Sequence, residues 1–120
     1  MTIKILIVED DPFIAMDLQD TFEDAGFQVA GPAASVDAGL HLIEKEDPDI
    51  AMLDYNLGQE TSIPIAQKLE KNDVPYAFLS GQIDRVVTSD LSAPKTVFSK
   101  PFSPAKIISY AKQLARPNII

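Results

Sequence analysis

The sequence predicts a single α/β domain built on a doubly wound parallel sheet. Short apolar runs alternate with amphipathic segments five times along the 120 residues, with no internal repeat or linker. The runs show little polar alternation, which is typical of strands buried on both faces. Successive parallel strands need crossover connections, and helices in those connections cover both faces of the sheet.

Each predicted strand is a short apolar run that ends at a polar or turn-forming residue. The five runs are residues 3–8, 27–30, 50–54, 74–79 and 96–99. We expect the second run to be closed by Gly31 and Pro32. The third places four apolar residues before one carboxylate, Asp54. On position alone, this acid is explained equally well as a cap or turn residue and as a ligand-binding group at a strand end.

The predicted helices combine apolar residues at helical spacing with recognisable ends. They cover about residues 12–25, 35–46, 62–71, 82–92 and 104–115. We expect polar side chains to cap three of them at the N-terminus: Asp11, Ser35 or Asp37, and Ser103. Proline at the first helical position supports two of these starts, and Gly26 ends the first helix. The 82–92 helix has the weakest support because its Val-Val-Thr run has low helix propensity.

Composition excludes several classes of protein. The chain has no cysteine and one histidine, which excludes disulfides, thiolate metal sites and a His-rich metal site. Its formal net charge of -8 argues against direct nucleic-acid binding and against anionic membrane surfaces. No apolar run approaches 18 residues, and the first strand is too short for a signal sequence. We therefore expect a cytoplasmic protein with no membrane partner.

Other conspicuous side chains are explained by ordinary structural roles. We expect Met16, Met52 and the six phenylalanines to fill the core, and His41 to lie on the surface. The acidic residues of the first helix are expected to form a solvated face: Asp17, Asp20, Glu23 and Asp24.

The ends of four predicted strands carry residues that could act together. The first strand is followed by Glu9, Asp10 and Asp11, the third ends in Asp54, the fourth runs into Ser80 and the fifth into Lys100. The carboxyl ends of parallel strands meet at one edge of the sheet. Clustered carboxylates repel one another unless a cation or proton joins them, and oxygen ligands with room for water suit Mg²⁺.

Carboxylate, metal, hydroxyl and ammonium around one point can hold a phosphoryl group, and Asp54 is placed to attack phosphorus. Singly, each residue has a common structural explanation as a helix cap, a turn or a loop residue. Their occurrence at the ends of the correct strands makes coincidence a poor explanation.

Taken together, these segments resemble a response-regulator receiver domain over essentially the whole chain. The matching pieces are Ile-Leu-Ile-Val-Glu-Asp-Asp-Pro at 5–12, Met-Leu-Asp-Tyr-Asn-Leu at 52–57, Ser-Gly at 80–81 and Lys-Pro-Phe at 100–102. The resemblance implies a flavodoxin-like (βα)5 sheet with strand order 2-1-3-4-5. It assigns residues 1–116 to the receiver domain and 117–120 to a C-terminal tail.

The resemblance also implies roles for individual residues. Asp54 would be the phospho-acceptor, Ser80 would bond one phosphoryl oxygen and Lys100 would pair with another. Mg²⁺, for which Mn²⁺ could substitute, would be held by Asp10, Asp54, the main-chain carbonyl of Asn56 and, through water, Glu9. Asp11 remains the helix cap, and Pro101 is expected to follow a cis peptide bond. The amides of Asn56 and Gln82 would set how long the phosphoryl group lasts.

One position departs from the family pattern. Most receivers carry Tyr or Phe three residues before the strand-five lysine, and here that place is Val97. Phe98 should point to the opposite face of the strand. Residues 75–81, Pro-Tyr-Ala-Phe-Leu-Ser-Gly, resemble the signature of the FATGUY subgroup of receivers, which are often stand-alone and linked to sensor kinases of the HWE type.

The expected function is that of a phospho-accepting receiver in a two-component system or phosphorelay. The donor would be a phosphohistidine of a sensor histidine kinase or a histidine phosphotransfer protein, and the first helix would dock it. Signalling would act on a downstream protein through helix 4, strand 5 and helix 5, with the 82–92 segment as an order–disorder element. The only reactions expected are the domain's own phosphoryl transfer and slow autodephosphorylation, in a monomer or weak homodimer.

Two alternatives belong to other classes of protein. A flavodoxin-like electron carrier would need a Ser/Thr/Gly-rich phosphate loop where this chain has three acids. An aspartyl-phosphate phosphatase would need a second acid two residues after the nucleophile, where this chain has Asn56.

Overall fold

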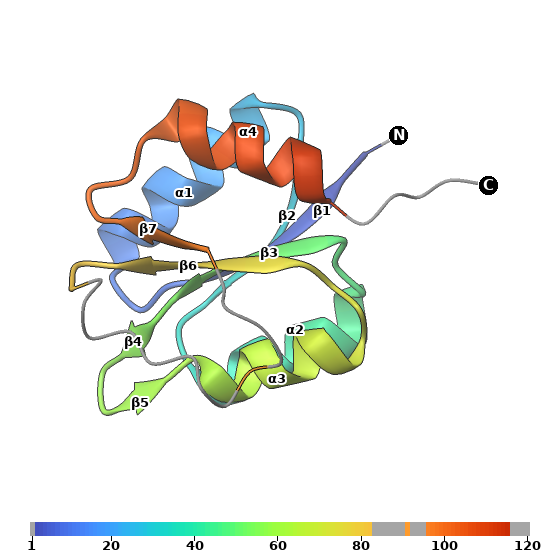
Figure 1. Cartoon of the computed structure of the whole chain (residues 1–120), viewed down its shortest axis with the longest axis vertical. Helices are drawn as coiled ribbons and strands as arrows, with labels where there is room; N and C mark the ends of the chain where they lie inside the picture. The colour runs from blue at the N-terminus through green and yellow to red at the C-terminus, as the bar shows by residue number, and fades with distance from the viewer. Residues whose placement is uncertain (1, 83–90, 92–95, 116–120) are drawn as a thin grey trace.

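The computed structural model describes residues 2–82, 91 and 96–115, and it has the predicted doubly wound architecture (Figure 1). Five parallel strands form one sheet in the order β2-β1-β3-β6-β7. Their bounds are β1 Lys4–Val8, β2 Gln28–Ala33, β3 Ile50–Asp54, β6 Tyr76–Ser80 and β7 Val97–Ser99. Since β6 and β7 are the fourth and fifth strands of this sheet, the predicted order 2-1-3-4-5 is confirmed. Most of the predicted 82–92 helix and the 117–120 tail lie outside the described residues.

Four described helices cover the two faces of the sheet: α1 Pro12–Asp24, α2 Val36–Glu46, α3 Ile63–Lys71 and α4 Pro104–Leu114. Figure 1 shows α1 and α4 on one face and α2 and α3 on the other. None of the helices in the described part of the chain combines the length and the apolar character that a bilayer crossing requires. The sheet therefore has a helical layer on each side.

The helix ends confirm two predicted caps and correct a third. Asp11 Oδ1 accepts hydrogen bonds from the N–H groups of Phe13 and Ile14 at 2.9 and 3.3 Å. Ser35 Oγ accepts one from Ala38 N–H at 3.2 Å. Ser103 occupies the N-cap position of α4, but its side chain makes no capping hydrogen bond. The prediction of a side-chain cap is wrong there, because the exposed hydroxyl can be solvated by water instead.

The second strand is longer than predicted. It continues through Gly31 and Pro32 to Ala33, and the pairing register shifts between Leu6 and Val8 on β1. Gly31 has φ +98, and a Cβ there would lie 2.8 Å from the carbonyl oxygen of Ile7. Only glycine fits this position without strain. The following Pro32 is tolerated because β2 is an edge strand.

The strands divide the core into two clusters. Leu53 and Phe78 face the α2–α3 layer, whereas Met52 and Leu79 face the α1–α4 layer. Neighbouring residues on a strand point to opposite faces, so each central strand contributes side chains to both clusters. All five residues of β3 are buried, as its unbroken apolar run predicts.

The expected core role is wrong for two side chains of α1. Met52 is buried, but Phe13 is 82% exposed and Met16 is 61% exposed. The buried stripe of this helix runs through Ala15, Leu18 and Phe22. Phe13 and Met16 are three residues apart and share a face outside that stripe.

The structure agrees with the other predictions about single side chains. Phe22, Phe27 and Phe78 are buried, and Phe98 and Phe102 are partly buried against the α1–α4 cluster. His41 is exposed, as expected.

Candidate functional site

The carboxyl ends of four strands bring the predicted site residues to one edge of the sheet. Val8 lies opposite Leu53, Asp54 opposite Leu79, and Ser80 opposite Ser99. In this register the residues that follow β1 and β7 stand beside the last residues of β3 and β6. Glu9, Asp10, Asp54, Ser80 and Lys100 are therefore collected by strand pairing alone.

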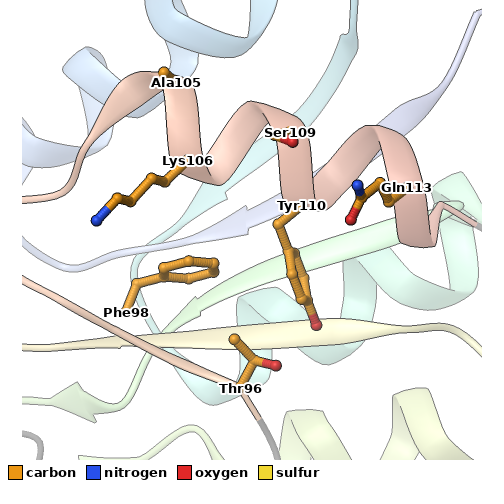
Figure 2. Close-up of a pocket in the computed structure, with 7 residues that line it drawn as sticks. All are labelled: Thr96, Phe98, Ala105, Lys106, Ser109, Tyr110 and Gln113. Carbon is orange, nitrogen blue, oxygen red and sulfur yellow. The ribbon is translucent and has the colours of Figure 1, made fainter.

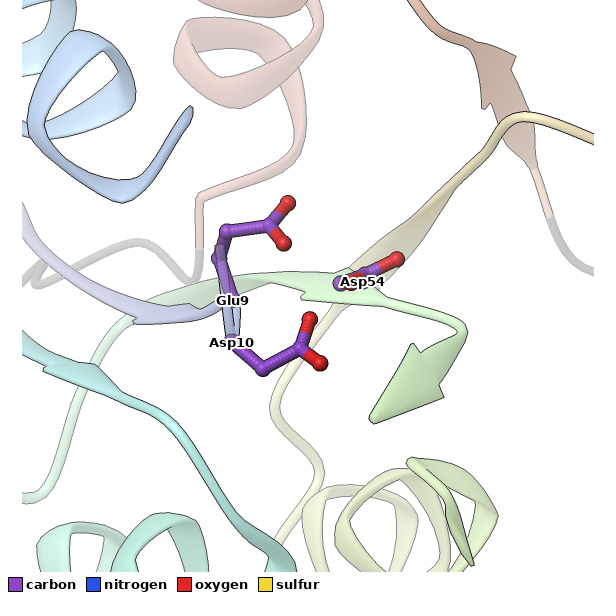
Figure 3. A group of neighbouring side chains, drawn as sticks. All are labelled: Glu9, Asp10 and Asp54. Carbon is purple, nitrogen blue, oxygen red and sulfur yellow. The ribbon is translucent and has the colours of Figure 1, made fainter. Parts of the chain in front are cut away.

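Three carboxylates form a compact acid cluster at this edge. Figure 3 shows Glu9 and Asp10 reaching from the end of β1 and Asp54 from the end of β3 toward a shared space. One carboxylate oxygen from each lies within 4.8 Å of the others. Glu9 and Asp54 are buried, and Asp10 is exposed. Backbone contacts fix Glu9: its N–H donates to Ala33 O at 2.8 Å, and its Oε2 accepts from Asp11 N–H at 3.1 Å.

Lys100 lies closer to the acids than the sequence suggested. Its Nζ is 2.8 Å from Glu9 Oε1 and 3.2 Å from Asp54 Oδ1, so one ammonium bridges the two buried carboxylates. Its backbone N–H donates to Ser80 O at 3.0 Å, which ties the end of β7 to the end of β6. The peptide bond to Pro101 is cis, as expected.

The cluster changes the protonation of its members. Burial, together with the neighbouring Glu9 carboxylate, raises the pKa of Asp54 to about 8, although Lys100 opposes the shift. Burial lowers the pKa of Lys100, but its contacts with Glu9 and Asp54 outweigh that effect and raise it overall. A carboxyl group with such a raised pKa lacks sufficient positive charge around it.

The residues present fit a divalent cation. Glu9 Oε1 is buried and has no hydrogen-bond donor in suitable geometry, despite its ion pair with Lys100. Three carboxylates face a single ammonium in the described cluster, and all the converging groups of the acids are hard oxygen donors. Mg²⁺ prefers such ligands and usually keeps several waters, and the exposed Asp10 leaves the cluster accessible to solvent.

Ser80 and the two flanking amides border the cluster. Ser80 is buried, and its Oγ accepts a hydrogen bond from Gln82 N–H at 3.0 Å. The hydroxyl therefore caps the turn that follows β6. Asn56 and Gln82, which lie two residues after the ends of β3 and β6, are exposed to solvent.

A small hairpin follows Asp54 where the sequence predicted a polar loop. β4 Asn56–Leu57 pairs antiparallel with β5 Glu60–Thr61, and Gly58 between them has φ +73. Val36 N–H at the start of α2 donates to Glu60 Oε2 at 3.2 Å. The glycine at the start of a two-residue turn is the signal that could have predicted this hairpin. It braces the residues that follow Asp54.

A doubly wound sheet with an acid cluster and a bridging lysine at its carboxyl edge defines a class of signalling domain that binds a metal and a phosphoryl group. Residues 5–112 match the family described as response regulator receiver domain, and the chain belongs to that family. Receiver domains have a phospho-accepting role in two-component signalling, interact with histidine kinases or phosphotransfer proteins, and bind Mg²⁺ at an acidic pocket. They are signalling domains rather than conventional enzymes.

Individual relatives agree with this assignment. The chain is 30% identical over 116 residues to the phyllosphere-induced regulator PhyR of Methylorubrum extorquens, covering 94% of this chain but 43% of PhyR. It is 25% identical to the chemotaxis protein CheY of Thermotoga maritima, covering 94% of this chain and 98% of CheY. The solution structure of the PhyR receiver domain of Erythrobacter litoralis matches with a TM-score of 0.83 at 27% identity, over 99% of this chain and 96% of that one.

Proposed function

We propose that Asp54 accepts a phosphoryl group from a phosphohistidine donor in a Mg²⁺-dependent reaction. The observation that carries this proposal is the convergence of Lys100, Glu9 and Asp10 on the one carboxylate at the end of β3. Asp54 is the acid of the cluster that ends a fully buried strand, and Lys100 Nζ at 3.2 Å positions its oxygen and opposes the rise of its pKa.

In the proposed reaction, a carboxylate oxygen of Asp54 forms a bond to phosphorus. The phosphorus–nitrogen bond of the donor breaks, and the imidazole nitrogen keeps the electron pair. The product is an acyl phosphate on Asp54. Lys100 pairs with one phosphoryl oxygen, and the Ser80 hydroxyl, whose oxygen accepts from Gln82 N–H, donates its proton to another. Asp10, Asp54, the main-chain carbonyl of Asn56 and, through water, Glu9 would hold Mg²⁺, which would supply positive charge to the phosphoryl oxygens.

The exposed face of α1 is the proposed docking surface for the donor protein. Phe13 and Met16 expose large apolar area there. A groove of about 340 Å³ beside the helix is lined by Met16, Glu9 and Asp10, and a second of about 140 Å³ by Lys100 and other residues. Both grooves open next to the acid cluster. We infer that a helical surface with apolar anchors and basic flanks lies on α1, since the acids of this helix would attract it: Asp17, Asp20, Glu23 and Asp24.

The finer assignments follow from the sequence resemblance. We infer membership of the FATGUY subgroup and a sensor kinase of the HWE type as the source of phosphoryl groups. The output would pass through the face formed by β7, α4 and the 82–92 segment to a downstream protein, with the domain a monomer or weak homodimer. Asn56 and Gln82 flank the pocket, and their amides would set a slow rate of autodephosphorylation by positioning or blocking water.

Binding of a phosphate mimic tests the phospho-acceptor directly. Beryllofluoride added with Mg²⁺ should give ¹⁹F resonances of protein-bound fluoride, and Asp54→Asn should abolish them. Asp73→Asn is the matched control, because Asp73 is exposed and has φ 57, a conformation that asparagine tolerates. The assignment of Asp54 is wrong if its asparagine variant binds the mimic as well as the control does.

A second experiment tests the docking surface. The double variant Phe13→Ala and Met16→Ala should slow phosphoryl transfer from a histidine phosphotransfer protein, but not from acetyl phosphate, which needs no docking surface. Both side chains are exposed, so truncation leaves the core intact. An equal loss with both donors would show that α1 affects the pocket rather than the docking.

A further inference from the structure

Val97 stands where most receivers have an aromatic residue, and its aliphatic side chain faces away from α4. Val97 packs against the α2–α3 cluster, whereas Phe98 packs against the α1–α4 cluster. Lys100 follows two residues later, and its neighbours Ile14 and Phe102 belong to the same α1–α4 side. An aromatic ring is therefore present close to the lysine, but on the other face of the strand.

Phe98 makes a defined ring contact with α4. Its ring centroid lies 5.3 Å from that of Tyr110, with the two planes at 83°, an edge-to-face arrangement. Such pairs prefer this geometry, so a displacement of one ring moves the other or breaks the contact.

Tyr110, on α4, is hydrogen-bonded to β6 rather than to β7. Its hydroxyl donates to the carbonyl oxygen of Tyr76 at 2.9 Å. Among the described residues, β7 pairs with β6 at Phe78, Leu79 and Ser80, and the Tyr110 hydroxyl bonds to the carbonyl of Tyr76 at the start of β6. The ring pair thus bridges the short edge strand β7 and a helix that is anchored to β6.

Both rings line a groove on the surface. Figure 2 shows Phe98 and Tyr110 side by side between β7 and α4, in a groove of about 460 Å³. The other lining residues are Thr96, Ala105, Lys106, Ser109 and Gln113. A shift of Phe98 against Tyr110 would change the wall of this groove.

We propose that the Phe98–Tyr110 pair transmits phosphorylation of Asp54 to the groove between β7 and α4. It would replace the aromatic residue that most receivers have at the position of Val97. This inference rests on the proposed function of Asp54. Lys100 must leave its bridge between Glu9 and Asp54 to pair with a phosphoryl oxygen, which lies farther out than the carboxylate oxygen it now contacts. Within the described part of the chain, β7 has three residues and one hydrogen-bonded neighbour, so it can follow the lysine, and Phe98 moves against the anchored Tyr110.

The experiment uses the full chain labelled with 3-fluorotyrosine, with Tyr110→Phe to assign its resonance. Beryllofluoride and Mg²⁺ are then added, and bound fluoride and the three tyrosines are observed in the same ¹⁹F spectrum. We expect the bound-fluoride signals to appear and the Tyr110 resonance to shift. In Phe98→Leu the fluoride signals should remain, while most of the Tyr110 shift is lost. Phe98→Ile provides a second shape in case the leucine variant does not fold.

Phe102→Leu is the matched control, because Phe102 is also partly buried in the α1–α4 cluster and makes no contact with the groove. It should retain the Tyr110 shift. If the mimic binds and Tyr110 does not shift, or shifts equally in the Phe98 variants, the relay is wrong while the phospho-acceptor assignment stands. If bound fluoride never appears in the wild-type protein, the proposed function fails, and the relay fails with it.

Discussion

Strands β3 and β7 each lead into a charged residue of the acid pocket, but the fold holds the two strands very differently. β3 lies between β1 and β6, and all of its residues are buried. β7 is a three-residue edge strand with two partly buried residues and one exposed residue. Asp54 is thus placed by a buried central strand and Lys100 by a short edge strand. This difference fits two roles in the proposed function: β3 positions the phospho-acceptor Asp54, and β7 responds to its phosphorylation.

Truncation of one core side chain on each strand should give the largest contrast. Leu53→Ala in β3 should lower the free energy of unfolding by about 2–5 kcal/mol, because the site is fully buried and truncation leaves a cavity. Val97→Ala in β7 should cost only about 1 kcal/mol, since the side chain is partly exposed. Urea denaturation measures both, and similar losses would remove the distinction between the strands.

Native-state hydrogen exchange should show the same contrast without mutation. The amide of Met52 should exchange only through an opening close to global unfolding. The amide of Phe98 should open at a free energy lower by about 2–4 kcal/mol, because short edge elements with few buried contacts open locally. Equal protection of the two amides would argue against a movable β7.

Neutralising the acceptor should stabilise the metal-free protein. The pKa of Asp54 is about 8 in the folded protein, against an ordinary value of 3.8. Between these values the folded state binds more protons than the unfolded state, so this group makes stability fall as pH rises from about 4 to about 8. Asp54→Asn should therefore raise the free energy of unfolding at pH 8 by about 1–3 kcal/mol, the usual cost of a poorly satisfied buried polar group.

The same substitution should have almost no effect near pH 4, where the wild-type carboxyl group is protonated in the folded state. Urea unfolding in the presence of EDTA measures the pH profile, with Asp73→Asn as the control that should change little at either pH. A destabilised Asp54→Asn at pH 8 would mean that Lys100 more than offsets the burial of the charge.

The helix caps should give the smallest contrast. Ser35 starts α2, the helix that leads to β3, and its hydroxyl makes a capping hydrogen bond. Ser35→Ala should cost about 1 kcal/mol. Ser103 starts α4, which follows β7, and makes no such bond, so Ser103→Ala should change stability by less than about 0.5 kcal/mol. Thermal unfolding of both variants checks this, and a larger loss at Ser103 would indicate a cap that forms in solution.

The sheet and the composition of the pocket followed from the sequence because both depend on local patterns. An apolar run of four residues before Asp54 is enough to specify a strand buried on both faces, and β3 has the predicted bounds. The parallel order then brings the residues after each strand to one edge, so Asp10, Ser80 and Lys100 could be grouped without knowing a distance.

The details that failed depend on direction and context rather than on residue type. Phe13 and Met16 are apolar and lie in a helix, but their exposure depends on where the buried stripe of α1 falls. The β4–β5 hairpin has too few apolar residues to produce a strand pattern, and only Gly58 indicates its turn. Ser103 has the correct residue type and occupies the N-cap position, but residue type alone does not ensure that the capping hydrogen bond forms.

The sequence by itself determined the five strands, their alternation with helices and the charged residues at the carboxyl edge. Each of these features depends on a local pattern of residue types. Only the tertiary structure decided that Lys100 bridges Glu9 and Asp54. It also decided that the ring of Phe98 packs against Tyr110. These contacts join residues from different elements, and their distances depend on how far β7 extends along β6 and how α4 lies on the sheet. No local pattern contains that information, since packing of the whole domain sets it.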